Sequence, residues 1–133
     1  MDKTEKFDQW LDIAKYDLGT AEAMRKTARW LYVVFMCQQA IEKLAKGLYI
    51  LYVDDNIPKI HNIRQIINKY ANQLSEEVST DYYDLFDRLT SFYLEGRYPE
   101  ELMQPSKIIN KKGAEDLHRQ TKEAFKWLLT MKP

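Results

Sequence analysis

Residues 30–53 read WLYVVFMCQQAIEKLAKGLYILYV, and their apolar side chains recur at the spacing of an α-helix. The apolar stripe consists of Trp30, Val33, Val34, Cys37, Ile41, Leu44, Leu48 and Tyr52. Three more large side chains, those of Leu31, Phe35 and Tyr49, widen the stripe beyond one face. A helix that is apolar on several sides needs cover on several sides. This stretch is therefore predicted to be the central helix of a helical domain.

Four other stretches have a helical period. The predicted helices cover about residues 4–25, about 62–73, a stretch that begins at the capping residues 79–81, and about 113–130. The helix that begins at 79–81 is expected to end at Gly96 in a left-handed cap, because Pro99 prevents it from restarting at once. Residues 97–112 are then the longest irregular segment, and no stretch alternates like a strand. We predict an all-α fold, an antiparallel up-and-down bundle of four long helices plus a shorter helix.

The composition fits one domain that covers residues 1–133. Lys and Arg number 20 and Asp and Glu also number 20, so the formal net charge is zero, which excludes a strongly basic nucleic-acid coat protein but leaves room for a local basic patch. Cys37 is the only cysteine, and its apolar neighbours predict a buried, inert thiol. The sequence has no apolar run of 18 residues and no apolar signal core near Met1, so we expect a cytoplasmic protein without a membrane span.

A row of polar side chains lies beside the apolar stripe of the central helix. Gln38, Glu42 and Lys46 step by four residues, and Gln39 and Lys43 form the next row. One interpretation is a solvated strip with an ion pair between Glu42 and Lys46. The other is a groove in which Lys43 or Lys46 meets a phosphate and Gln39 holds a polar edge of a ligand. The residue types alone leave both open.

The segment from Tyr93 to Pro99 is the second candidate for chemistry. Arg97 follows the expected helix cap, and its planar guanidinium suits a phosphate or a carboxylate. Tyr93 and Tyr98 offer faces on which a base could stack. Equally, Arg97 could pair with a carboxylate of the fold while the tyrosines only fill space.

The two histidines are predicted to be structural. His61 precedes the third predicted helix, where a cap or a packed imidazole is commonest, and His118 is expected to be half-buried. They lie far apart in sequence and no cysteines cluster with them, so neither a metal site nor a cofactor is predicted. No catalytic residue is assigned, because no phosphate-binding glycine loop, nucleophile elbow or zinc-protease motif is present.

Taken together, these features resemble the HEPN domain family, which occurs in prokaryotes and in the eukaryotic protein sacsin. The resemblance covers about residues 10–128. It rests on the segments AKYDL at 14–18 with Ala21, YVVFMCQQAIEKLAK at 32–46, HNI at 61–63, and Tyr93 with RYP at 97–99. The QQ–EK–K helix and the RYP segment are the discriminating parts.

The resemblance implies an up-and-down bundle, often a homodimer, and nucleotide binding as in the sacsin-type branch. Many family members are ribonucleases paired with a minimal nucleotidyltransferase as toxin and antitoxin. Those ribonucleases use an Arg that is followed four to six residues later by a His. Here Arg97 is followed by YPEELMQ at 98–104, without a histidine, so the ribonuclease role is not implied.

We therefore predict a non-catalytic HEPN-like module that binds a nucleotide or a nucleic acid as a homodimer. The expected ligand-binding residues are Gln39, Glu42, Lys43, Lys46, His61, Tyr93, Arg97 and Tyr98. The alternative is a protein-interaction scaffold, or the partner of a minimal nucleotidyltransferase in a toxin–antitoxin-like pair. A ribonuclease that uses His61 or His118 is the least favoured hypothesis.

Overall fold

The computed structural model describes residues 1–94 and 105–133 of the chain. The elements are α1 (Lys3–Lys26), α2 (Trp30–Tyr52), α3 (Ile63–Asn68), the 3₁₀ turn η1 (Ala71–Gln73), α4 (Thr80–Thr90), α6 (Pro105–Ile108) and α7 (Lys111–Thr130). The described part of the chain contains no strand, which confirms the predicted all-α class. None of the described helices is long and apolar enough to cross a membrane.

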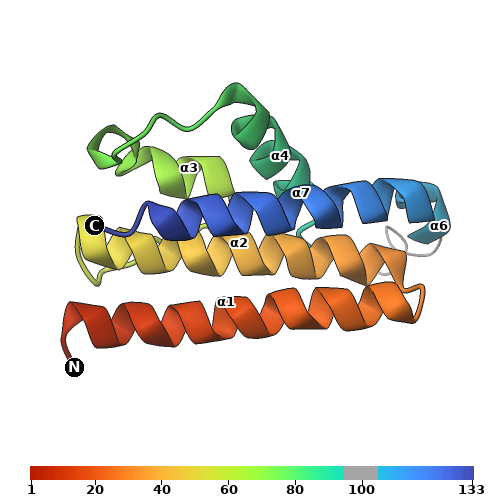
Figure 1. Ribbon diagram of the computed structural model, residues 1–133, viewed down its shortest axis with the longest axis horizontal. Coiled ribbons are helices and arrows are strands. Elements are labelled where there is room, and N and C mark those ends of the chain that lie inside the picture. The colour runs from red at the N-terminus through yellow and green to blue at the C-terminus, as the bar shows by residue number, and fades with distance from the viewer. Residues whose placement is uncertain (95–104) are drawn as a thin grey trace.

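The long helices lie side by side, with α2 between α1 and α7 (Figure 1). α1 and α2 run in opposite directions, and α7 runs in the same direction as α2. α3 and the inclined α4 lie on the side of the bundle away from α1, and both contact α2. The stretch predicted to be central is therefore the helix that touches every other large element.

Side-chain caps define where most helices begin. Asp2 accepts a hydrogen bond from the backbone N–H of Glu5 at 2.8 Å, and Ser79 accepts one from Tyr82 at 3.1 Å. The side chain of Asn110 accepts from Gly113 at 2.8 Å, so α7 begins two residues earlier than predicted. Each cap satisfies a backbone donor that has no partner inside the helix.

α4 ends at Thr90, earlier than the predicted end at Gly96. The next residues form a turn in which Phe92 donates to the Leu89 carbonyl at 2.9 Å and Tyr93 donates to the Thr90 carbonyl at 3.1 Å. The Thr90 hydroxyl donates to the carbonyl of Phe86 at 2.8 Å, which competes with continued helix. Tyr93 therefore follows the helix instead of lying on it, and Gly96 falls outside the described residues.

The third helix is also shorter than predicted. α3 stops at Asn68, and Tyr70 leaves helical geometry with φ of −138° before η1 begins. The turn buries the Tyr70 ring, whose hydroxyl donates to the Ala45 carbonyl of α2 at 2.7 Å. Tertiary burial of one aromatic ring thus overrides the helical period of the sequence.

Cys37 lies in the core with no exposed surface, as predicted. Burial raises the pKa of its thiol to about 12, so the thiolate needed for a nucleophile is absent at neutral pH. His118 is more deeply buried than expected, with 3% of its surface exposed.

Candidate functional site

The polar row of α2 is buried, so it is not the solvated strip that one interpretation proposed. Gln38, Glu42 and Lys46 have 0%, 4% and 7% of their surface exposed. The ion pair between Glu42 Oε2 and Lys46 Nζ does form, at 3.1 Å. Buried charges are tolerated only when they are paired and hydrogen-bonded, so the partners of Glu42 decide what this site can do.

Glu42 is the centre of the cluster. Its Oε1 accepts a hydrogen bond from Gln38 Nε2 at 2.7 Å, and both of its oxygens lie within 3.2 Å of His61 Nδ1. Because a carboxylate only accepts hydrogen bonds, His61 carries a hydrogen on Nδ1. The other ring nitrogen, Nε2, has no hydrogen-bond partner among the described residues.

The cluster continues toward α1 through side-chain hydrogen bonds. Gln39 Nε2 donates to Gln38 Oε1 at 2.7 Å, and Lys43 Nζ donates to Gln39 Oε1 at 3.2 Å. Lys43 also pairs with Asp17 Oδ2 at 2.5 Å. Asp17 is a member of the cluster that sequence reasoning missed. The signal was an acidic residue four positions before the inward-facing Ala21, on the edge of the apolar stripe of α1.

His61 and Tyr93 form a stacked pair of rings above Glu42. Their centroids are 4.1 Å apart and their planes differ by 15°. The Tyr93 ring also lies 6.4 Å from that of Phe35 on α2. The His61 side chain is 45% exposed, whereas the Glu42 carboxylate beneath it is buried.

The structure thus brings six of the eight predicted residues into one connected cluster, namely Gln39, Glu42, Lys43, Lys46, His61 and Tyr93. The other two, Arg97 and Tyr98, lie outside the described residues. Gln38 joins the cluster as a bridge between Gln39 and Glu42. The six residues, together with Gln38 and Asp17, form what we call the Glu42 cluster.

The charges of the Glu42 cluster balance within the fold. Lys46 is paired with Glu42, and Lys43 is paired with Asp17. The positive charge of each lysine is therefore already neutralised by a carboxylate of the fold. What the cluster offers to solvent is the half-exposed imidazole of His61, the half-buried ring of Tyr93 and the partly exposed ends of Gln39 and Lys43.

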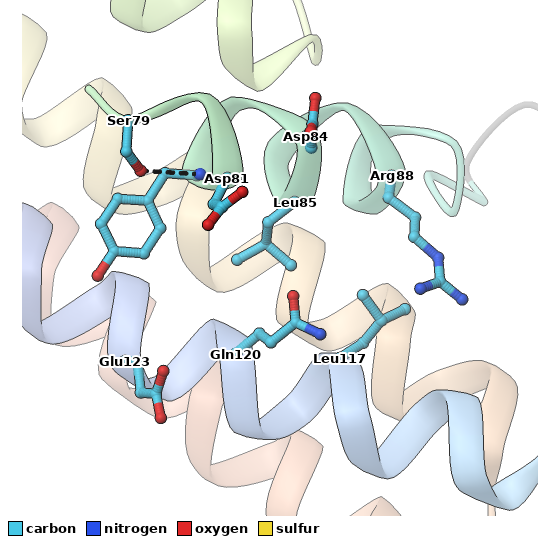
Figure 2. Close-up of a pocket in the computed structure, with 9 residues that line it drawn as sticks. Ser79, Asp81, Asp84, Leu85, Arg88, Leu117, Gln120 and Glu123 are labelled. Carbon is cyan, nitrogen blue, oxygen red and sulfur yellow. Dashed lines mark hydrogen bonds between the residues drawn. The ribbon is translucent and has the colours of Figure 1, made fainter.

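A hollow of about 660 Å³ lies elsewhere, between α4 and α7 (Figure 2). Leu85 points from α4 toward Gln120 and Leu117 of α7, and polar side chains make up most of the rest of the lining. The lining residues are Ser79, Asp81, Tyr82, Asp84, Leu85, Arg88, Leu117, Gln120 and Glu123. None of the six residues of the predicted site that the structure describes lines it. Within residues 1–94 and 105–133, no three His, Cys, Asp or Glu side chains gather so as to hold a metal ion.

Comparison with known proteins supports one family. The sequence model of the HEPN domain matches residues 7–131, nearly the whole chain. Among solved structures, TT1696 from Thermus thermophilus is similar, with 19% sequence identity and a TM-score of 0.79 over 95% of this chain and 98% of that chain. At that identity the likeness shows a shared fold. No curated protein matches the sequence.

Proposed function

The chain belongs to the HEPN domain family, and from this premise we propose that it is a non-catalytic module that binds a nucleotide or a nucleic acid as a homodimer. The Glu42 cluster is the proposed binding site. This function agrees with a site in which a half-exposed imidazole is stacked on a tyrosine ring above a buried carboxylate.

One observation carries the proposal, namely the stacked pair of His61 and Tyr93 over the buried Glu42 carboxylate. An aromatic platform recognises bases because every base has a π-face, and stacking on such a side chain contributes about 1–3 kcal/mol per base. The hydrogen bond from Nδ1 to Glu42 fixes the plane of the imidazole before any ligand arrives. A fixed platform loses little conformational entropy on binding.

The role proposed for each residue follows from how deeply its side chain is buried. His61 and Tyr93 contact the base, with His61 Nε2 available for a hydrogen bond. Gln39 and Lys43, which are intermediate in exposure, contact the polar edge of the ligand. Glu42 and Lys46 are positioning residues that hold His61 from below. Arg97 and Tyr98 are proposed to supply a phosphate contact and a further stacking face, as the sequence predicts.

The test is a binding titration of ATP, GTP, UTP and a short single-stranded RNA against the parent and Tyr93→Leu. Leucine keeps an apolar side chain but removes the π-face, so affinity should fall about tenfold. Tyr16→Leu is the matched control, because Tyr16 lies 77% exposed on α1 and is not part of the cluster. Equal binding by the parent and Tyr93→Leu, with both folded by circular dichroism, would overturn the proposal.

A specific observation favours a second candidate, the interaction scaffold. Glu42 and Lys46 neutralise each other inside the bundle, which is also what a purely organising role requires. In that case no nucleotide or RNA binds, and the relevant partner is a protein such as a minimal nucleotidyltransferase. Failure of every ligand in the titration would favour this candidate, and co-purification of a nucleotidyltransferase would support it.

A further inference from the structure

A second hollow, of about 480 Å³, lies between α1 and α7, and we call it the α1–α7 groove. Its lining residues are Lys15, Leu18, Gly19, Glu22 and Arg25 of α1 with His118 and Lys122 of α7. None of these residues belongs to the Glu42 cluster. The volume is within the range of small-ligand sites, which is roughly 300–1,000 Å³.

The groove contains a buried imidazole nitrogen without a hydrogen bond. His118 has 3% of its surface exposed, its Nε2 has no hydrogen-bond partner among the described residues, and Glu22 Oε2 lies 3.5 Å away. Nearly all buried polar atoms in folded proteins are hydrogen-bonded, so an exception that lines a hollow points to a missing partner.

The charge of the groove is positive. Three cationic side chains, those of Lys15, Arg25 and Lys122, stand against the single carboxylate of Glu22. The Arg25 charge is already taken up, because its guanidinium donates two hydrogen bonds of 2.9 and 2.7 Å to Glu22 and its Nη1 lies 3.8 Å from Glu115 Oε1. Lys15 and Lys122 are exposed and form no ion pair with any described residue. Their charges are therefore available to an anion, unlike those of Lys43 and Lys46.

Gly19 keeps the groove open on the side of α1. A glycine in the interior of a helix is normally disfavoured relative to alanine. A Cβ atom added at Gly19 would meet nothing within 4 Å, so open space adjoins the backbone here. The absence of a side chain gives a ligand access to the wall between Lys15 and Glu22.

We propose that the α1–α7 groove binds a phosphate group, with Lys15 and Lys122 around its oxygens and His118 Nε2 as a hydrogen-bond donor from the buried side. The imidazole is neutral in the empty groove, because burial first, and Lys122 second, lower the pKa of His118. A neutral imidazole with its hydrogen on Nε2 still donates one bond. Free phosphate and the phosphate of a nucleotide share this chemistry. The site is separate from the one proposed for the base.

The first test follows the His118 ring signals by NMR while inorganic phosphate replaces chloride at constant ionic strength. In the parent, the His118 signals should shift and saturate, and the same titration of Gly19→Met should leave them in place. Methionine favours helix and would occupy the open space beside the backbone, so it blocks the groove without unfolding α1. Absence of a saturating shift in the parent would overturn the proposal, as would an equal shift in Gly19→Met.

The second test removes the lysines one at a time. Lys15→Gln and Lys122→Gln should each weaken phosphate binding about tenfold, because each removes a charge-assisted hydrogen bond. Lys112→Gln is the matched control, since it removes the same charge from α7 at a position that does not line the groove. Equal weakening by all three variants would indicate a general effect of net charge and would overturn the site.

A parallel titration with AMP distinguishes the two sources of the phosphate. Equal affinity for AMP and inorganic phosphate shows that only the phosphate group is held, and tighter AMP binding shows that the nucleoside is held too. Either result supports the proposed site, provided that Gly19→Met abolishes the binding. Tyr93→Leu should leave the His118 response unchanged, so failure of the base-binding site and failure of the groove are distinguishable.

Discussion

Lys46 shows what a buried charge contributes at the scale of a single residue. Its ammonium is paired with Glu42 inside the bundle, and replacing one partner of such a pair leaves the other charge uncompensated. Lys46→Met should therefore lower the free energy of unfolding by about 3 kcal/mol, measured by urea denaturation. The double variant Glu42→Leu/Lys46→Met should recover much of that loss, because it removes both charges. A single variant as stable as the parent would contradict a role for the pair.

His118 makes stability depend on pH. Burial lowers its pKa below the ordinary value of 6.5, so below that pH the unfolded chain binds a proton more readily than the folded chain. Glu22 and Glu115 act in the opposite direction and Arg25 in the same direction, but the net shift is downward. The unfolding free energy should thus fall as the pH drops below 6.5. His118→Gln, which cannot titrate, should have a smaller slope in denaturation curves measured across this range. An identical slope would contradict this assignment.

At this scale the sequence predicted which residues lie together but not which of them form ion pairs. The steps of four from Gln38 to Lys46 showed a shared side of α2. The neutralisation of Lys43 depends on Asp17, which lies 26 positions away on another helix. No local pattern encodes such a pair, so only the fold shows that both Lys43 and Lys46 have carboxylate partners.

At the scale of helices, two glycines provide a matched pair. Gly47 of α2 faces α1 so closely that an added Cβ would lie 3.2 Å from the Cβ of Trp10 and 3.2 Å from Cδ2 of Phe7. Gly19 of α1 faces open space. Alanine gains about 0.5–1 kcal/mol over glycine in a helix interior, whereas overpacking costs about 1–3 kcal/mol.

Gly19→Ala should consequently raise the unfolding free energy by about 0.5–1 kcal/mol. Gly47→Ala should lower it by about 1 kcal/mol, because α1 must move away. Chemical denaturation of the two variants and the parent measures whether each substitution raises or lowers the unfolding free energy. If Gly47→Ala were as stabilising as Gly19→Ala, the close approach of α1 and α2 would be in doubt.

The helix boundaries show where prediction from sequence stops. The period of α1, α2 and α7 is long enough to fix each helix within about two residues. The apolar stripe after residue 80 continues to Tyr93, but the helix ends at Thr90, and Phe92 and Tyr93 are packed from a turn. An apolar residue at the right interval can be buried without being helical. Periodicity alone does not reveal this difference.

At the scale of the molecule, the bundle could be predicted because its central helix is apolar on several sides. The site could be predicted only in part. The cluster draws on α1, α2, the segment before α3 and the turn after α4, and their convergence depends on packing. The α1–α7 groove carried no signal in the sequence, since Lys15, Gly19 and Lys122 are ordinary surface positions until the two helices are placed side by side.

The proposed homodimer is the last property that belongs to the whole molecule. With equal numbers of acidic and basic residues, the chain has no net charge to oppose association with a second copy at neutral pH. Dimerisation stabilises only the native state, so the melting temperature should rise with protein concentration. Each tenfold increase adds about 1.4 kcal/mol per dimer, which corresponds to about 3 °C for a domain of this size.

Scanning calorimetry over a hundredfold range of concentration checks this expectation, and sedimentation equilibrium on the same samples gives the mass. Added salt is the control: because the chain has no net charge, there is no net repulsion for salt to screen, and the dependence of the melting temperature on concentration should persist. A melting temperature that does not change with concentration, together with a monomer mass of 15.9 kDa, would contradict the homodimer. That result would leave the Glu42 cluster and the α1–α7 groove as sites on a single chain, since every residue assigned to either comes from one copy.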